Sequence, residues 1–382
     1  MSEVRVLANP RAAARAQPYA AAQALSAEGF AAATREISAW PGYAPTPLLA
    51  LPALAASLGL ARLWYKDERG RFGLKSFKAL GGAYAVRRVL ERQGLPAKEV
   101  TVTCATDGNH GRSVAWGAQL FGCRSVIFIH ETVSEGRAEA IRHYGAEVRR
   151  VKGNYDDAVR HAAAEAARNG WYVVSDTSYA GYRDVPLDVM HGYGVMAAEI
   201  AAQLPADRVP THVFVQAGVG ALAAAICASF WLRWRERRPR LVVVEPARAD
   251  CFYRSLEAGR PTAVHGDLDT VMAGLACGEV SQLAWEVLET GADAAVAIDD
   301  ASALEAVRVL ARPREPDPVI VAGETGGAGL AALLALRDRP ELRAQFALGA
   351  DAEVLLLGSE GDTDPEIYRR IVGRSADEVL AA

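Results

Sequence analysis

The stretch His212-Val-Phe-Val-Gln-Ala-Gly-Val-Gly-Ala-Leu-Ala223 places an apolar, β-branched run directly before two glycines and an alanine-rich segment. The run 212–216 predicts a buried strand, and residues 220–238 predict a helix. The glycines between them predict a tight turn that joins the strand to the helix. In open α/β sheets, ligands bind beyond the carboxyl ends of such strands.

The same pattern recurs along most of the chain. Further predicted strands are 100–104, 125–130, 172–175, 241–245, 319–322 and 354–357. Further predicted helices are 78–93, 111–121, 135–144, 155–169 and 327–336. Alternation of this kind predicts an α/β fold with mostly parallel twisted sheets flanked by helices. The near-continuous apolar strands predict sheets that are buried on both faces.

Length and composition indicate a globular protein of about two domains. The chain has 382 residues, of which 51% are hydrophobic and 23% are charged. The formal net charge is -4, and this argues against nucleic acid or an anionic membrane as the main partner. The longest basic run, residues 233–240, is interpreted as the polar end of a helix.

Targeting and metal signals are also missing from the sequence. We find no apolar stretch of about 20 residues and no secretory signal, which predicts no membrane partner. The five cysteines are widely spaced, and neither C-x-x-C nor H-E-x-x-H occurs. We therefore expect no metal site and a reducing, cytoplasmic location.

The segment 71–82 (RFGLKSFKALGG) contains a candidate nucleophile, Lys78, at the start of a predicted apolar helix. The positive end of the helix dipole and partial burial both lower the pKa of an amine. A lowered pKa suits a lysine that forms a Schiff base, because the neutral amine is the nucleophile. An isolated lysine is more often a surface cation, and Lys75 is a competing candidate.

Two more turns lie between a predicted strand and a predicted helix. Asp107 and Asn109 occupy the turn 104–112 (CATDGNHGR), whose composition alone also fits an ordinary glycine turn. The turn at Gly218 and Gly220 exposes amides at a helix start, which suits a phosphate. With Glu245 at the end of the next strand, this turn also fits a dinucleotide fingerprint, so that alternative stays open on these residues alone.

Together the three segments resemble the fold-type II family of pyridoxal 5'-phosphate (PLP) enzymes. The matching stretches are 76–78 (SFK), 107–111 (DGNHG), 218–222 (GVGAL), 46–48 (TPL) and the turn around Glu324. The resemblance runs from about residue 40 to 370 and leaves little room for a dinucleotide enzyme. Within the family the chain is most similar to the diaminopropionate ammonia-lyases, through long stretches such as 272–279 (MAGLACGE) and 360–364 (EGDTD).

The resemblance implies α,β-elimination of 2,3-diaminopropionate to pyruvate and ammonia. Lys78 would hold the cofactor and then act as a general base, and Asn109 would contact the cofactor's 3'-oxygen. Ser359 would meet the pyridine nitrogen. The phosphate would bind the amides of the turn that comprises Gly218, Val219, Gly220, Ala221 and Leu222.

Asp107 and Asp176 are the carboxylates to which the resemblance gives a role. Asp107 would remove a proton from the face opposite Lys78, so that both enantiomers could react, or pair with a substrate ammonium. Asp176 would bind the distal amino group or assist its departure. The alternatives are a helix-capping aspartate at 107 and an ordinary strand-end aspartate at 176. We expect His110 to pack or hydrogen-bond locally.

The resemblance also implies an organisation. A large PLP-binding domain would comprise residues 1–97 and 205–382, and a small domain, 98–204, would carry the loop 107–111. The partners would be a small amino-acid substrate and a second copy in a homodimer. Cys251 and Cys277 could approach each other, although a reducing compartment disfavours a disulfide. The alternative functions are a serine/threonine dehydratase-like lyase and a non-catalytic PLP-binding protein.

Overall fold

The computed structural model describes residues 4–19, 24–106, 108–153 and 155–381. Within these residues the strands form a seven-stranded sheet, in the order β1-β10-β9-β8-β11-β3-β2, and a four-stranded sheet, in the order β6-β5-β4-β7. The strands are β1 Val4–Ala8, β2 Leu48–Ala50, β3 Arg62–Asp67, β4 Thr101–Ala105, β5 Arg124–His130, β6 Glu147–Val151, β7 Tyr172–Val173, β8 His212–Gln216, β9 Arg240–Pro246, β10 Ala294–Ile298 and β11 Glu353–Gly358.

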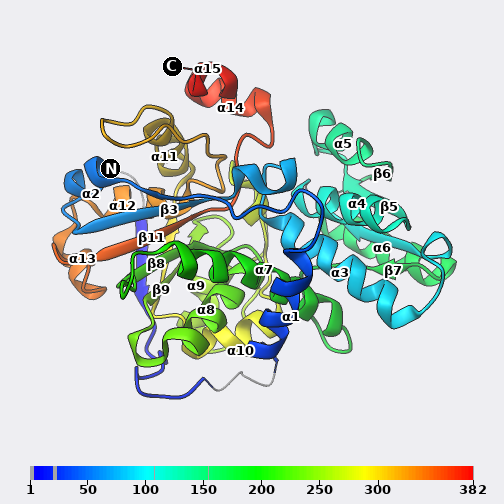
Figure 1. The fold of residues 1–382 in the computed structure, drawn as a ribbon, viewed down its shortest axis with the longest axis horizontal. Helices are drawn as coiled ribbons and strands as arrows, with labels where there is room; N and C mark the ends of the chain where they lie inside the picture. The colour runs from blue at the N-terminus through cyan, green and yellow to red at the C-terminus, as the bar shows by residue number, and fades with distance from the viewer. Residues whose placement is uncertain (1–3, 20–23, 107, 154, 382) are drawn as a thin grey trace.

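Helices surround both sheets (Figure 1). The α-helices are α1 Ala27–Ile37, α2 Pro52–Ser57, α3 Lys78–Gln93, α4 Asn109–Phe121, α5 Glu135–Arg142, α6 Tyr155–Asn169, α7 Asp184–Gln203, α8 Ala221–Trp234, α9 Cys251–Ala258, α10 Gln282–Gly291, α11 Asp300–Ala311, α12 Ala328–Leu336, α13 Pro340–Gln345, α14 Pro365–Val372 and α15 Ala376–Leu380. Short 3-10 helices lie at Glu68–Gly73, Ala97–Glu99, Arg235–Arg237 and Ala273–Leu275.

The predicted α/β fold with mostly parallel sheets is confirmed. Every strand pair of the four-stranded sheet is parallel. In the larger sheet, antiparallel pairing is confined to the two edge strands, β1 against β10 and β2 against β3. The edge strands and β3, β6 and β10 were not predicted, because they are short, polar or alanine-rich. The sequence alone makes no reliable distinction between such segments and helices or loops.

The predicted strand 319–322 is wrong. Ile320, Val321 and Ala322 are buried, but their backbone forms no strand. An apolar composition indicates that a segment is buried. It does not show whether a neighbouring strand has unpaired backbone groups with which the segment could pair. Here β8 pairs with both β9 and β11, and β11 pairs with both β8 and β3, so the middle of the sheet offers no edge.

The larger sheet is buried on both faces, as predicted. Successive side chains of a strand point to opposite faces. Accordingly, Val213 and Val215 of β8 pack in one hydrophobic cluster, and Phe214 between them packs in another. The first cluster includes side chains of α7, α8 and α10, and the second includes side chains of α12.

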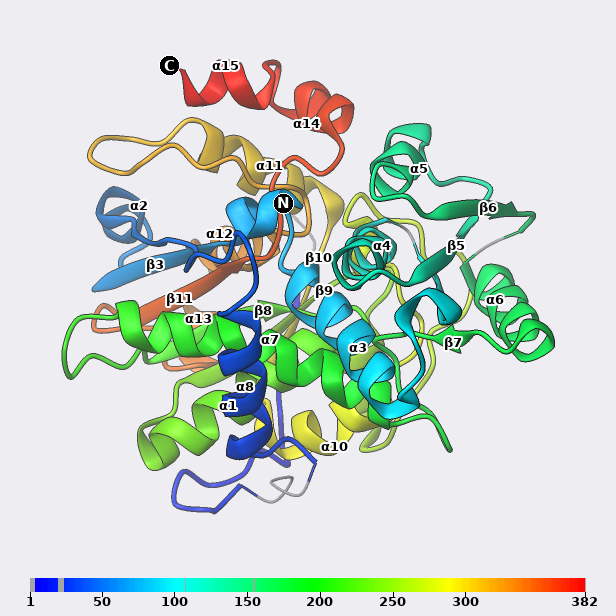
Figure 2. The same cartoon turned by 45° about the vertical axis from the view of Figure 1, so that its right-hand side comes forward.

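Close packing of α3 against α4 sets the relative positions of their first residues, Lys78 and Asn109. The two helices lie side by side in Figures 1 and 2. A Cβ atom added at Gly117 of α4 would lie 2.6 Å from the Cα of Ala83 in α3, so only glycine allows this approach. Both helices begin at the same end, where the two sheets meet.

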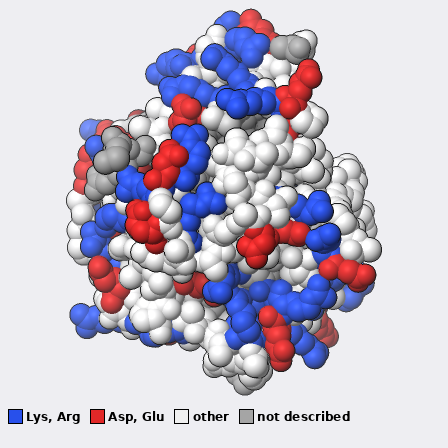
Figure 3. Space-filling model, turned by 90° about the vertical axis from the view of Figure 1, so that its left-hand side faces the viewer, with Lys and Arg blue, Asp and Glu red and all other residues white. Residues whose placement is uncertain are grey.

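The basic run at residues 233–240 follows the expectation in part. Arg233 lies in the last turn of α8 and is exposed, as the polar end of a helix is. Arg238 is buried instead, stacked 4.0 Å above the ring of Trp231, and donates to the carbonyls of Ala13 and Arg15. On the face in Figure 3, basic and acidic side chains are interspersed among uncharged ones. Within the described chain, no helix has the length and apolar character needed to cross a bilayer.

Candidate active site

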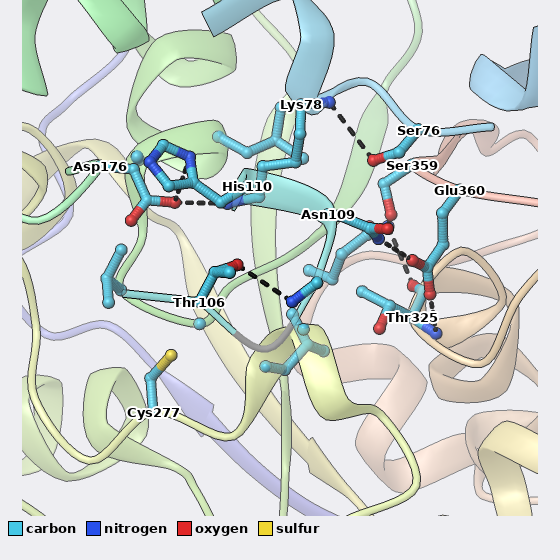
Figure 4. Close-up of a pocket in the computed structure, with 18 of the residues that line it drawn as sticks. Ser76, Lys78, Thr106, Asn109, His110, Asp176, Cys277, Thr325, Ser359 and Glu360 are labelled. Atoms are coloured by element: carbon cyan, nitrogen blue, oxygen red, sulfur yellow. Dashed lines mark hydrogen bonds and ion pairs between the residues drawn. The ribbon is translucent and has the colours of Figure 1, made fainter. Parts of the chain in front are cut away.

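A pocket lies where the carboxyl end of β4 meets the carboxyl ends of β8 and β11. The empty space within it, including its open mouth, is about 940 Å³. The helices α3, α4 and α8 all begin at its wall. The predicted site residues that line it are Lys78, Asn109, Asp176, Ser359 and the turn 218–222 (Figure 4). Asp107 lies outside the described residues.

Lys78 forms an ion pair with Asp176, and both residues line the pocket. Burial alone would lower the pKa of Lys78, but the charge and hydrogen bond of Asp176 outweigh it, with help from Tyr193, and raise the pKa. The predicted lowering of this pKa is therefore wrong for the protein without ligand. Burial would raise the pKa of Asp176, yet Lys78 and His110 lower it, so the pair is charged.

His110 lies beside this ion pair. Its Nε2 is 2.8 Å from the carbonyl oxygen of Val174, so Nε2 carries the hydrogen and Nδ1 is an acceptor. Nδ1 lies 4.0 Å from Asp176 Oδ2 and is buried with no hydrogen-bond partner among the described residues. Burial lowers the pKa of His110 and favours the neutral ring. The local hydrogen bond confirms one part of the expectation, but His110 also lines the pocket.

The start of α8 forms the second wall. Gly220 has φ +93, and a Cβ atom there would lie 2.3 Å from the Cζ of Phe252, so glycine is required on both grounds. In the described chain no side chain caps this helix, and its first amides face the pocket from residues 218–222. Uncapped amides at the positive end of a helix dipole are a ready anion site.

Ser359 follows β11 and is buried in the pocket wall. Gln216, the last residue of β8, donates from Nε2 to Ser359 Oγ at 2.6 Å. Because the serine oxygen accepts this bond, its own proton is left to donate to another acceptor. Gln216 was missed at the sequence level, although it stands immediately before the glycine turn.

Asn109, the first residue of α4, lies opposite Ser359. The turn before it is fixed by Thr106, whose hydroxyl accepts from the amides of Gly108 and Gly111 at 3.0 Å each. Asn109 donates from Nδ2 to Glu360 and accepts from Arg112 at 3.0 Å. Glu360 belongs to the stretch 360–364, which the sequence analysis singled out without giving it a role.

Two rival residues lie away from the pocket. Lys75 points to Asp362, with Nζ 2.5 Å from Oδ2, and is absent from the pocket lining. Glu245 is fully buried and caps α9 by accepting from the amides of Phe252 and Tyr253. Burial raises the pKa of Glu245 to about 8, and no ribose-binding role remains for it.

The donor set of the pocket fits PLP rather than a metal. An amine for the aldehyde, an uncapped helix start for the phosphate and a hydroxyl for the ring nitrogen surround one space. Across the described residues, no three His, Cys, Asp or Glu side chains group as metal ligands. Cys277 lines the same pocket, and both it and Cys251 are thiols in this structure.

Comparison with known proteins agrees with this geometry. The model of the family described as "Pyridoxal-phosphate dependent enzyme" matches residues 39–356. Diaminopropionate ammonia-lyase of Escherichia coli K12 is 41% identical over 349 residues, which are 87% of this chain and 88% of the relative. Threonine dehydratase 1 of Solanum lycopersicum is more distant, at 30% identity over 64% of this chain and 38% of the relative.

A solved structure shares the fold over almost the whole length. Diaminopropionate ammonia lyase from Escherichia coli, in complex with an aminoacrylate-PLP azomethine reaction intermediate, superposes with a TM-score of 0.90. The two sequences are 38% identical, and the match covers 97% of each chain. The chain therefore belongs to the pyridoxal-phosphate dependent enzymes and, among them, to the diaminopropionate ammonia-lyases.

Proposed function

We propose that this chain is a PLP-dependent ammonia-lyase that converts 2,3-diaminopropionate and water to pyruvate and two molecules of ammonia. The observation that carries the proposal is the Lys78–Asp176 ion pair, which faces the uncapped start of α8 across one pocket. A lysine is needed to hold the cofactor, and a buried carboxylate suits a substrate with a second ammonium group.

As in the rest of its family, PLP is the cofactor of this chain. When bound, it supplies a conjugated ring that stabilises negative charge at the substrate's Cα. We assign its covalent attachment to Lys78, its phosphate to the amides of residues 218–222 and its 3'-oxygen to Asn109. Ser359 would donate to the ring nitrogen, since its oxygen accepts from Gln216 and its proton is available.

Lys78 acts first as an anchor and then as a base. With the substrate bound, the amine of Lys78 would be the base that removes the Cα proton. Its raised pKa in the absence of ligand depends on the Asp176 carboxylate. When a cation of the substrate pairs with Asp176, the pKa of Lys78 is therefore lowered. The lower pKa favours the neutral amine that a base requires.

Asp176 binds the distal amino group of the substrate. A buried carboxylate without a cation is costly, so loss of the Lys78 charge leaves Asp176 in need of a new partner. The distal ammonium supplies that charge, and the lone pair of His110 Nδ1 lies 4.0 Å from the same carboxylate oxygen. The distal amine is thus held in its protonated form, which is the form that leaves as ammonia.

Asp107 is the proposed base for the second enantiomer, on the cofactor face opposite Lys78. We expect Asp107→Asn to abolish turnover of D-diaminopropionate and to spare more of the L reaction, because one base is lost and Lys78 remains. Separate rate assays on the two isomers measure this. Equal losses on both isomers would count against a base on each face.

Three further assignments complete the proposal. We infer a homodimer and a cytoplasmic location. We also divide the chain into a large domain, 1–97 plus 205–382, and a small domain, 98–204. In support of the division, the four-stranded sheet lies wholly within residues 101–173. Helix α7 ends the second range but packs against α1, α3 and α8 of the first, so it forms the connection between the two proposed domains.

An absorption spectrum and a product assay test the function. We expect purified protein with PLP to show a visible band and to release pyruvate and ammonia from diaminopropionate faster than from serine. Faster turnover of serine or threonine would favour the dehydratase alternative instead. A visible band with no product from any of these amino acids would favour a non-catalytic PLP-binding protein.

A further inference from the structure

Glu360 is a buried carboxylate in the pocket wall to which the proposed mechanism gives no role. It follows Ser359 directly and is 6% exposed. The main chain of residues 359–361 is hydrogen-bonded to two other segments, Gly323 and residues 75–77. The Glu360 carbonyl accepts from the Gly323 amide at 3.1 Å, and the flanking amide of Gly361 donates to the carbonyl of Lys75 at 2.9 Å. Phe77, next to Lys78, donates its amide to the carbonyl of Ser359 at 3.0 Å.

The Glu360 carboxylate accepts hydrogen bonds from several donors. Oε2 accepts from Asn109 Nδ2 and from the hydroxyl of Thr363 at 3.4 Å, and Oε1 accepts from the amide of Thr325 at 3.3 Å. Figure 4 shows Asn109 and Glu360 pointing toward each other. Asn109 begins α4, whereas Glu360 follows β11, so this contact joins elements that are 251 residues apart.

The partners of Asn109 determine which way its amide faces. A carboxylate only accepts hydrogen bonds, and a guanidinium only donates them. Glu360 therefore requires the NH₂ side of the amide, and Arg112, which donates to Oδ1 at 3.0 Å, requires the oxygen side. A flipped amide would face the carboxylate with its oxygen and the guanidinium with its nitrogen, and both contacts would become repulsive.

We propose that Glu360 is a positioning residue that acts through Asn109: it holds one hydrogen of the Asn109 NH₂ group and so presents the other to the 3'-oxygen of the cofactor. This inference rests on the proposed function, because it takes Asn109 as the partner of that oxygen. The main chain of residues 359–361 is hydrogen-bonded to that of residues 75–77. The Glu360 carboxylate therefore also fixes the position of Asn109 relative to Lys78.

A double-mutant cycle on the PLP-loaded enzyme tests this assignment. The variants are Glu360→Gln, Asn109→Ala and the double variant, and the readout is the pH midpoint at which the visible cofactor band changes. Glutamine both donates and accepts, so it lets the Asn109 amide turn over. We expect Glu360→Gln to shift the midpoint by roughly 0.5–1 pH unit, the size of one weakened charge-assisted hydrogen bond. In the Asn109→Ala background it should cause no further shift.

Asp362→Asn is the matched control, because Asp362 is a buried carboxylate two residues away that pairs with Lys75 and Arg69 instead. It should leave the midpoint unchanged. A normal midpoint in Glu360→Gln, with a lower free energy of unfolding, would overturn the inference and leave Glu360 a structural residue. The same shift in both backgrounds would also overturn it, because Glu360 would then act without Asn109.

The cofactor-free protein gives an independent measurement of the contact. The unfolding free energies of the same four proteins yield the coupling between Asn109 and Glu360, which we expect to be different from zero. A coupling of zero would contradict the contact itself. If the wild-type protein formed no visible band, the proposed function would fail together with this inference. A normal band that is insensitive to Glu360→Gln overturns this inference alone.

Discussion

Two lysines of this protein, the buried Lys66 and the half-buried Lys78, both pair with a carboxylate, but they differ in what else surrounds them. Lys66 belongs to a group of buried polar residues that we call the scaffold network: Thr46, Lys66, Glu68, Arg71 and Glu199. Lys78 pairs with Asp176 in the pocket. The chain therefore contains two such lysine–carboxylate pairs. Lys66 and Glu199 lie away from the pocket lining, and Lys78 and Asp176 lie in the pocket wall.

In the scaffold network, charges are surrounded by protein partners. Lys66 Nζ donates to the Thr46 carbonyl, to Glu199 and to Gln203 at 2.6–3.0 Å. Arg71 binds both Glu68 and Glu199 at 2.7–2.9 Å. In these five described residues, every buried side-chain nitrogen and oxygen has a hydrogen-bond partner.

In the pocket, by contrast, some buried polar atoms have no hydrogen-bond partner among the described residues. These atoms include His110 Nδ1 and Gln216 Oε1. Both atoms belong to residues that line the pocket. Buried charge with complete partners supports a structure, whereas buried charge beside unpartnered atoms indicates a ligand.

Removal of Lys78 should give the largest effect. We expect Lys78→Ala to abolish the visible band and to lower turnover by about 10³-fold or more, because both anchor and base are lost. Absorption spectra and pyruvate assays measure this. A surviving band would mean that another lysine carries the cofactor.

Breaking the scaffold network should affect stability rather than chemistry. Glu199→Gln leaves Lys66 and Arg71 short of one buried carboxylate and should cost about 3–5 kcal/mol of unfolding free energy. Folded molecules should keep their visible band and turnover. If the variant does not fold, Tyr43→Phe removes one donor to Glu199 and should cost about 1 kcal/mol.

The pH dependence of this effect has a definite sign. Burial alone would raise the pKa of Glu199, but Arg71 and Lys66 lower it below its usual value. The stabilisation from Glu199 is therefore present above the unfolded-state pKa and is lost as the pH falls through the lower folded-state pKa. The stability difference between wild type and Glu199→Gln should shrink in acid. A difference that grew in acid would contradict the assignment.

Asp176→Asn should separate substrates. We expect kcat/KM for diaminopropionate to fall about 10²-fold, and that for D-serine to fall much less, because serine has no distal ammonium. Steady-state kinetics on both amino acids measure the ratio. An equal loss on both would show that Asp176 serves Lys78 alone and does not bind the substrate.

The smallest effect is expected at the exposed lysine. Lys75 is paired with Asp362, and its side chain is 37% exposed. Lys75→Met should change the unfolding free energy by about 0–1 kcal/mol and leave the visible band and turnover intact. A lost band would reverse the roles of the two lysines.

The sequence predicted what depends on local pattern. The strands at 212–216 and 241–245 and the helix at 78–93 follow from uninterrupted runs between turn residues, and the structure reproduces them closely. Lys78, Asn109 and the turn 218–222 were found because three glycine-containing segments each precede a helix, whereas Asp176 and Ser359 were assigned through the family resemblance. The resemblance to the fold-type II PLP enzymes then gave these segments their proposed roles in binding the cofactor.

What the sequence missed depends on contacts between distant residues. The pKa of Lys78 is raised by Asp176, which is 98 positions away, and no local argument contains that charge. The segment 319–322 lacks a strand because both neighbouring edges are occupied. The role of Glu245 as a helix cap depends on the fold of the following loop.

The place of β11 in the larger sheet has a consequence for biosynthesis. This strand is the last of the chain, yet it lies between β8 and β3 and leads directly to Ser359 and Glu360. During translation β3 and β8 leave the ribosome long before residues 353–360 do. The position between β8 and β3 therefore has no strand until β11 has been made. The vitamin B6 binding site can therefore be assembled only after β11 and the residues that follow it have been made.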